Sequence, residues 1–259
     1  MKGINQVHFI GSIAKFEMKY TAGELAILEL TVAGKEQVVN ADGETRTAHF
    51  YNRCKAFGPY AEALAESLQQ GDVVSAQGRL DYRSWEQDGE KRSTVETVIA
   101  SIQTLGGNFV TEDDKLGQPV LVDGLNSVTI GGNLTKDAEL RYTPNGTAVT
   151  HLSVAVNENF GKDQERVGFY NAQGWAELAE VLAAGSKGQG VIGVGRIVSE
   201  SWEDGDGKKR YGTKIEFDRA HFVAGKQRQA AAKGGSQGQR TAPPQSVDQE
   251  FPPEQDLPF

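Results

Sequence analysis

The stretch Asn5-Gln-Val-His-Phe-Ile-Gly11 has a counterpart in the second half of the chain, Asn126-Ser-Val-Thr-Ile-Gly-Gly132. Further segments repeat in the same order: Tyr20-Thr21 with Tyr142-Thr143, Leu30-Thr-Val-Ala33 with Leu152-Ser-Val-Ala155, Phe50-Tyr51-Asn52 with Phe169-Tyr170-Asn171, and Gly78-Arg79-Leu80 with Gly195-Arg196-Ile197. The spacing between them drifts by only a few residues, which chance similarity does not produce. Because there are two copies and not many, the pattern indicates a duplicated domain rather than a solenoid.

Each copy reads mostly as strand. Apolar and polar residues alternate in Leu28-x-Leu30-x-Val32 and again in Leu152-x-Val154-x-Val156, as they do in half-buried strands. One helix interrupts each copy, after Pro59 in the first and around Leu178 in the second, and each copy then ends in two strands joined by a charged hairpin. Three strands, one short helix and two strands form the plan of an OB fold, a five-stranded Greek-key barrel. We therefore predict an all-β chain with two tandem OB barrels at residues 1–106 and 125–225.

The composition narrows the class of protein. The chain has 259 residues, with 27 Lys+Arg against 35 Asp+Glu and a formal net charge of -8, so it does not bind nucleic acid through bulk positive charge. It contains no run of roughly 18 apolar residues that could span a membrane, and no signal-type stretch. The expected location is therefore the cytoplasm.

Neither a metal site nor a catalytic site is expected. Cys54 is the single cysteine, and the four histidines are scattered. The motif Gly188-x-Gly190-x-x-Gly193 follows a helix and enters a strand, the reverse of the order that a dinucleotide site needs. We predict a protein that is not an enzyme and that needs no cofactor.

Two segments outside the repeats differ in composition. Residues 107–124 hold Gly, Pro and an acidic cluster and read as a linker, with Val120-Leu-Val122 as a possible short strand. Residues 226–247 carry four basic residues and no acid, and residues 248–259 carry four acids and no base. Few residues there could bury apolar surface, so both are predicted to be disordered, as a basic spacer and an acidic tip.

Aromatic residues recur beside basic residues in both copies. Single-strand binding without sequence preference needs this mixture, because aromatic faces stack on bases while Lys and Arg follow the phosphates. The candidate residues in the first copy are Tyr51, Arg53, Phe57, Arg79, Arg83, Trp85, Lys91 and Arg92. Those in the second copy are Phe160, Phe169, Trp175, Arg196, Trp202, Lys208, Lys209 and Arg210.

The aromatic residues also have a structural interpretation, as members of the barrel core. Phe57 and Trp175 fit either role, whereas Trp85 and Trp202 stand at the base of charged hairpins, where a core tryptophan is less expected. Two alternative functions also stay open, an OB-fold adaptor that binds only proteins and an accessory RNA-binding module.

The chain resembles the bacterial single-stranded DNA-binding proteins, in the variety with two OB domains per chain. The resemblance covers both repeats and the tail. It is most specific in the stretch from Asn126 to Gly146, in Gly195-Arg196 with Trp202, and in the terminal Asp256-Leu-Pro-Phe259. It implies binding of exposed single strands near the nucleoid in DNA replication, recombination and repair after DNA damage, and a homodimer that presents four OB domains.

The resemblance also assigns roles to particular residues. Base-stacking positions of the family fall on Tyr51 and Phe169, on Phe57 and Trp175, and on Trp85 and Trp202; a further one meets Phe160 in the second copy but Val38 in the first. The two domains are therefore expected to bind unequally. The tip resembles the family's docking segment for genome-maintenance enzymes, through Asp248, Glu250, Glu254, Asp256, Leu257, Pro258 and Phe259.

Overall fold

The computed structural model describes residues 3–39, 43–87, 89–159, 165–203, 207 and 209–223. The predicted spacer and tip, residues 226–259, lie outside these ranges. The elements of the first half are β1 (Ile4–Tyr20), β2 (Ala26–Val39), β3 (Thr45–Phe57), α1 (Gly58–Ser67), β4 (Val73–Gln87) and β5 (Glu90–Thr104), followed by β6 (Thr111–Asp113) and β7 (Pro119–Leu121). Those of the second half are β8 (Leu125–Leu134), β9 (Glu139–Tyr142), β10 (Ala148–Asn159), β11 (Glu165–Trp175), α2 (Ala176–Leu182), β12 (Gly190–Glu203) and β13 (Lys209–Val223).

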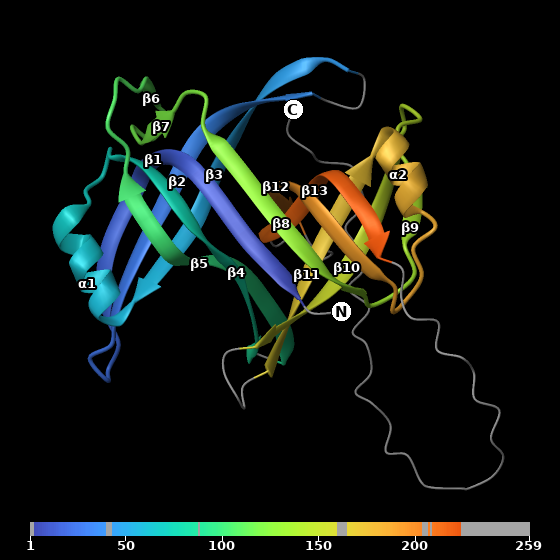
Figure 1. Cartoon of the computed structure of the whole chain (residues 1–259), viewed down its shortest axis with the longest axis horizontal. Coiled ribbons are helices and arrows are strands. Elements are labelled where there is room, and N and C mark those ends of the chain that lie inside the picture. The colour runs from blue at the N-terminus through green and yellow to red at the C-terminus, as the bar shows by residue number, and fades with distance from the viewer. Residues whose placement is uncertain are drawn as a thin grey trace, which may run out of the picture.

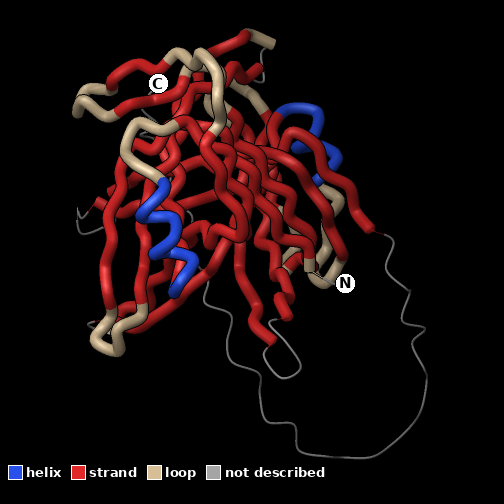
Figure 2. The backbone as a smooth tube through the Cα atoms, turned by 60° about the vertical axis from the view of Figure 1, so that its left-hand side comes forward, coloured by secondary structure: helices blue, strands red, loops and turns tan. Residues whose placement is uncertain are grey.

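Each half closes into a five-stranded barrel, which confirms the predicted fold. In the first barrel, β1 pairs with both β2 and β4, and a short parallel pairing of β3 with β5 closes the ring. The second barrel repeats this arrangement with β8, β10, β11, β13 and β12. Strands dominate the described part of the chain, and its two short helices, α1 and α2, lie at opposite ends (Figures 1 and 2).

The two barrels join edge to edge through β1 and β8, which run side by side across the middle of the molecule (Figure 1). Val7 pairs with Val128, and these two residues are equivalent in the repeat. The junction therefore has an approximate two-fold axis between them. It creates a continuous six-stranded sheet in the order β5-β4-β1-β8-β12-β13.

The alternation in the sequence explains which side chains enter the barrels. Leu28, Leu30 and Val32 of β2 are buried in the core, as are Leu152 and Val154 of β10. In the turn between β9 and β10, Gly146 adopts a φ of 81°, which glycine tolerates.

Strand pairing corrects one detail of the repeat. Ala33 of β2 faces Tyr51, and its counterpart Ala155 faces Phe169 and not Tyr170. Phe169 is therefore the structural equivalent of Tyr51, in agreement with the position that the family resemblance gives, and Asn52 corresponds to Tyr170. An alignment of the two copies by their identical residues is therefore one residue out of register in the third strand.

The segment between the barrels is more ordered than a simple linker. Residues 107–124 form a small hairpin, which we call the linker hairpin, and its strand β7 continues the sheet beside β2. Val120 and Leu121 are buried. The sequence indicated a short strand at this place but not its partner β6.

Candidate nucleic-acid interface

A groove of about 810 Å³ lies between the first barrel, the linker hairpin and the β12–β13 hairpin of the second barrel. Its walls combine aromatic, cationic and anionic side chains. Those from the first barrel include Lys15, His49, Tyr51 and Arg53; those from the linker are Asp113, Asp114, Lys115, Leu116 and Gln118; those from β12 and β13 include Ser199, Glu200, Tyr211 and Thr213. Both barrels therefore contribute to one site.

The alternation along β3 decides which side chains face the groove. Phe50, Asn52 and Cys54 are buried, so Tyr51 and Arg53 between them point out of the barrel. The structure thus brings together two of the residues that the sequence predicts for binding.

The hydroxyl of Tyr51 donates a hydrogen bond to Oδ2 of Asp114 in the linker hairpin, with an O–O distance of 3.1 Å. Burial, together with this hydrogen bond, raises the pKa of Tyr51 to about 12. The hydroxyl therefore remains a donor at neutral pH.

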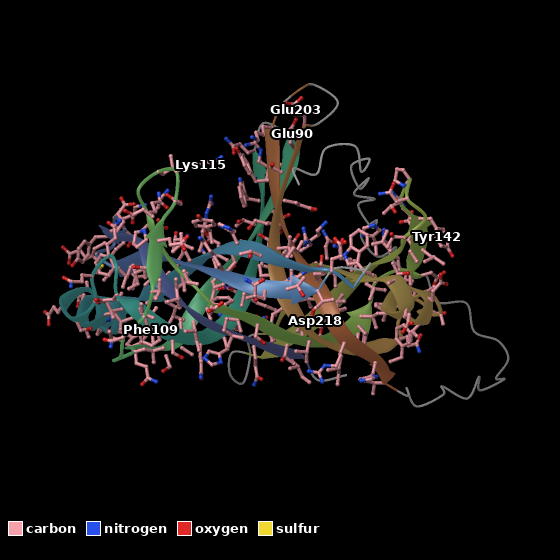
Figure 3. The ribbon with its side chains drawn as sticks, turned by 90° about the horizontal axis from the view of Figure 1, so that it is seen from above. Glu90, Phe109, Lys115, Tyr142, Glu203 and Asp218 are labelled. Atoms are coloured by element: carbon pink, nitrogen blue, oxygen red, sulfur yellow. The ribbon has the colours of Figure 1, made fainter. Side chains whose placement is uncertain are left out.

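The β12–β13 hairpin brings a second aromatic residue to the groove. Tyr211 is 73% exposed, and Nζ of Lys209 lies 5.8 Å from the centre of its ring. Glu90 and Glu203 lie near the ends of the two long hairpins. These ends rise on the same side of the molecule as the loop that carries Lys115 (Figure 3). Sequence reasoning selected Lys209 but missed Tyr211, although it follows a run of three basic residues.

The same sequence reasoning also missed Lys15, His49 and Lys115. Lys15 and His49 each adjoin a phenylalanine, Phe16 and Phe50, whereas Lys115 has no aromatic neighbour in the sequence. Only the folded chain brings these side chains to the groove.

The second barrel has an equivalent surface built from Phe169. This side chain is 46% exposed and meets the ring of Tyr82, from the β4–β5 hairpin, edge to face at 5.7 Å between centroids. Trp85 lies farther along the same hairpin and is 45% exposed. An exposed indole on a projecting strand can stack on a base without rearrangement of the core.

Phe57 and Trp175 occupy equivalent places, at the residue before each helix. Trp175 is only partly exposed, and its indole N–H donates to Oε2 of Glu216 at 3.0 Å. The same carboxylate accepts from Gln173 and Arg196. Trp175 is therefore held against its own barrel.

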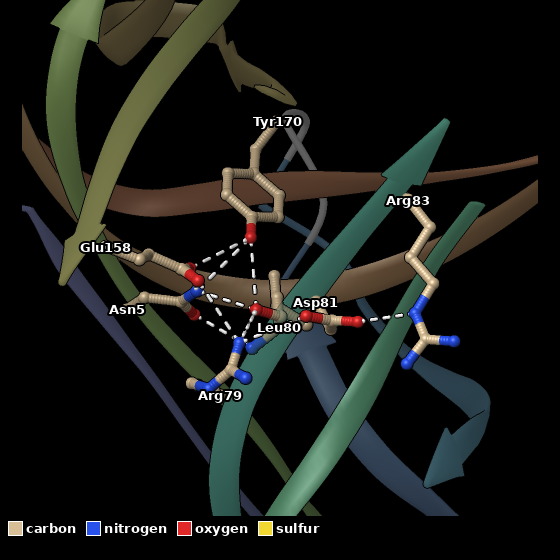
Figure 4. A network of polar contacts seen from close by, with 7 residues as sticks. All are labelled: Asn5, Arg79, Leu80, Asp81, Arg83, Glu158 and Tyr170. Carbon is tan, nitrogen blue, oxygen red and sulfur yellow. Dashed lines mark hydrogen bonds and ion pairs between the residues drawn. The ribbon is translucent and has the colours of Figure 1, made fainter. Parts of the chain in front are cut away.

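Two of the predicted phosphate ligands, Arg79 and Arg196, form ion pairs within the protein. Arg79 Nη1 lies 3.2 Å from Asp81 and 3.1 Å from Glu158 of the second barrel (Figure 4). The side chain of Arg196 is 11% exposed and pairs with Glu216. The structure does not bring either guanidinium to the groove beside Tyr51.

Arg79 belongs to a polar network that crosses the junction between the barrels. The side chain of Asn5 accepts from the amide of Leu80 and donates to its carbonyl oxygen, both at 2.8 Å, and Tyr170 of the second barrel donates to the same oxygen at 3.0 Å (Figure 4). Asn126 makes the equivalent pair of bonds with Ile197. These bonds fix each long hairpin where it leaves the sheet.

Arg83 lies at the edge of this network, on the part of β4 that leads to Trp85. Its Nε donates to Asp81 at 2.7 Å, while half of its side chain is exposed. Arg92, on the facing strand, is 3.6 Å from Glu90.

Several predicted site residues lie where the structure gives no side-chain description. Phe160, Lys208 and all the tip residues are outside the described residues, and Lys91, Trp202 and Arg210 are described only as backbone within strands β5, β12 and β13.

The described part of the chain contains no group of three His, Cys, Asp or Glu side chains that could hold a metal ion. Neither of its helices is long and apolar enough to cross a membrane.

Both the sequence and the fold of the chain match those of known proteins. The model of the single-strand binding protein family matches residues 4–105 and again 125–223. A single-stranded DNA-binding protein of Thermus aquaticus is 41% identical over 266 aligned positions, which cover 100% of this chain and 99% of the relative. One from Deinococcus radiodurans is 40% identical, over 86% of this chain and 76% of the relative. The crystal structure of the wild-type Thermus aquaticus protein superposes with a TM-score of 0.70 at 35% identity, over 92% of this chain and 98% of that one.

Proposed function

Because the chain belongs to the single-strand binding protein family, we propose that it binds single-stranded DNA without sequence preference. The observation that carries this proposal is the groove between the barrels, where Tyr51 and Tyr211 lie with Lys15, Arg53 and Lys115. Aromatic faces stack on any base, at about 1–3 kcal/mol each, and cations follow the phosphates. Neither interaction reads the sequence.

The β4–β5 hairpin extends the proposed path to the second barrel. Exposed Trp85 supplies one stacking face, and Phe169 beside Tyr82 supplies another. By the repeat, Trp202 takes the place of Trp85 on the β12–β13 hairpin. A strand that passes through the groove and over both hairpins would contact each barrel once.

The experiment is a tryptophan-fluorescence titration with poly(dT) across a salt series. The proposal expects quenching and an affinity that falls as salt rises, because bound phosphates release counterions. A Trp85→Ala/Trp202→Ala double variant should bind more weakly and lose most of the quenching; unchanged affinity and quenching would contradict stacking by these two residues.

Two further assays address the alternative functions. Titration with poly(U) separates this function from that of an RNA-binding module, and a nucleotide-turnover assay separates it from that of an enzyme. An adaptor that binds only proteins would bind neither poly(dT) nor poly(U) at low salt.

We propose further that the protein is a homodimer with four barrels. The side of the six-stranded sheet that faces away from the cores carries Ile10, Ile192 and Val194, which are only half-buried in one chain. Covering them with a second copy would remove apolar surface from water. Light scattering that gives the mass of one chain would contradict this proposal.

The cellular role is a proposal as well. We infer that the protein coats exposed single strands in the cytoplasm during replication, recombination and repair, and that the acidic tip, residues 248–259, recruits partner enzymes. A terminal Pro-Phe beside four carboxylates is suited to an apolar pocket with a basic rim. Deletion of the tip should abolish capture of genome-maintenance proteins, and retained capture would count against recruitment.

A further inference from the structure

Tyr51 and Phe169 are structural equivalents, yet their surroundings differ. Phe169 is close to half exposed and makes an edge-to-face contact with Tyr82 of the β4–β5 hairpin. Tyr51 packs against a small buried cluster of Ala14, Ala33 and Val120, and Val120 comes from the linker hairpin. The linker hairpin therefore restrains one of two residues that the repeat makes equivalent.

The carboxylate that binds Tyr51 is itself firmly placed. Oδ1 of Asp114 accepts hydrogen bonds from the amides of Leu116 at 2.8 Å and Gln118 at 2.9 Å. Its Oδ2 is then left directed at the hydroxyl of Tyr51. The Gln118 amide in particular holds the pKa of Asp114 below its ordinary value, so this group is ionised at neutral pH.

The linker hairpin is anchored to the first barrel at several points. Ser12 Oγ donates to the carbonyl oxygen of Pro119 at 2.7 Å. The amide of Gly124 donates to the carbonyl oxygen of Lys35 at 2.6 Å. Lys35 also forms an ion pair with Glu112. The contact with Tyr51 is therefore a built feature of the fold and not a chance approach of a loose loop.

The charged side chains that line the groove also indicate that the linker hairpin opposes binding. Lys15, Arg53 and Lys115 bring three positive charges, whereas Asp113, Asp114 and Glu200 bring three negative ones. Two of these three carboxylates belong to the linker hairpin. The third, Glu200, is already paired with Lys214 at 2.9 Å. The two linker carboxylates therefore weaken the attraction of the groove for a phosphate chain, and they would lie close to any strand whose bases reach Tyr51.

We propose that the linker hairpin is an autoinhibitory element of the groove, in which Asp114 holds Tyr51 and the carboxylates of Asp113 and Asp114 oppose the phosphates of an entering strand. This inference rests on the proposed function. Single-stranded DNA must compete with the linker hairpin for Tyr51, so the first barrel binds more weakly than its aromatic and cationic residues alone would allow.

The opposite role for Asp114, positioning Tyr51 for stacking, makes the opposite prediction. If the hydrogen bond served to orient the ring, its removal would weaken binding. If it holds the ring back, its removal leaves binding equal or stronger. Tyr51→Phe separates the two, because it removes the hydroxyl and keeps the stacking face.

The test uses the full chain and a dT oligonucleotide at low salt. Asp113→Asn/Asp114→Asn keeps the shape of both side chains, and an asparagine oxygen can still accept from the amides of Leu116 and Gln118. We expect about fivefold tighter binding, which corresponds to the modest energies of exposed charges. The gain should shrink at high salt, where such charges are screened.

The matched control is Asp123→Asn. Asp123 is an exposed acid of the same linker that does not line the groove, and its φ of 59° suits asparagine. The proposal is overturned if the double variant binds no more tightly than Asp123→Asn, if its gain is the same at high salt, or if Tyr51→Phe binds more weakly than the unchanged chain. Absence of any binding by the unchanged chain would instead overturn the proposed function.

Discussion

Arg79 and Arg196 illustrate how far a single residue can be understood from its neighbours in the sequence. Both stand a few positions before a hairpin tryptophan, and this predicts phosphate contacts. One of the two carboxylates that face Arg79 belongs to Glu158 of the other barrel, 79 positions away. No local pattern reveals such a partner. Tyr51 and Arg53 were easier to place, because strand alternation alone sends them outward.

Asp81 is the acid of the junction network that binds both Arg79 and Arg83. Its side chain is 7% exposed, and Arg79 and Arg83 each bind one of its two oxygens. Replacement by asparagine removes the charge that both guanidiniums face. We expect Asp81→Asn to cost about 2 kcal/mol at neutral pH, the range for a lost charge-assisted hydrogen bond in a protein interior.

This cost should depend on pH in a defined direction. Burial alone would raise the pKa of Asp81, but the hydrogen bonds from Arg83 and Arg79 outweigh it and hold the pKa below the ordinary 3.8. The stabilisation is therefore complete above that value and is lost as the pH falls through the folded-state pKa. Denaturant unfolding of both proteins at pH 7 and pH 3 should give a difference that shrinks in acid. Glu62→Gln, on the exposed side of α1, is the control, and a difference that grows in acid would refute the argument.

The strands and helices follow the local sequence closely, whereas the linker hairpin does not. Alternation predicts β2 and β10, and the helix predicted in the first copy forms as α1, which begins at Gly58, just before Pro59, and ends at Ser67. The linker hairpin contains only two short strands, and its burial depends on Ser12, Gly34 and Lys35, far away in the chain. An acidic, glycine-containing segment gives no local sign of such docking.

Gly78 and Gly195, the first residues of the repeated Gly-Arg pair, have a shared role in the long hairpins. The register of β4 with β5 shifts at Gly78, and that of β12 with β13 shifts at Gly195. A Cβ atom at Gly195 would collide with the backbone oxygen of Glu216, and one at Gly78 with that of Val98. Each glycine therefore allows the bulge that bends a hairpin out of the sheet.

Gly195→Ala should accordingly destabilise the chain by about 1–3 kcal/mol, the usual cost of overpacking. It should also weaken binding of single-stranded DNA, because the displaced β12–β13 hairpin carries Tyr211 away from the groove. Thermal unfolding and a dT titration measure the two effects. Gly106→Ala is the control, since no atom lies within 4 Å of its added Cβ. Equal stability of the two variants would show that the bulge tolerates a side chain.

At the scale of the whole molecule, the two-fold symmetry of the junction is incomplete. Equivalent residues meet at Val7 and Val128, and Asn5 and Asn126 bind equivalent hairpins. The symmetry ends at the linker hairpin, which packs on the first barrel, and at Tyr170, which replaces Asn52. The repeat in the sequence predicts the two barrels, but their unequal surfaces arise from contacts that only the assembled chain contains.

Charge acts on the molecule as a whole as well. Deletion of residues 248–259 removes four acids and no base, so the formal net charge changes from -8 to -4. A less negative protein repels DNA less, and we expect the deletion to tighten binding of poly(dT) by about threefold at low salt. Because the effect is one of screened charge, it should disappear at high salt.

A second deletion distinguishes this general effect from a direct one. Removal of residues 226–259 takes away four basic and four acidic residues and leaves the net charge at -8. If net charge alone governs the gain, this shorter chain binds poly(dT) like the full chain. If instead the acidic tip competes with DNA by lying in the groove beside Arg53 and Lys115, both deletions bind more tightly, because both remove the tip. Titrations of the three chains at two salt concentrations separate the two mechanisms, and equal affinity of all three at low salt would exclude both.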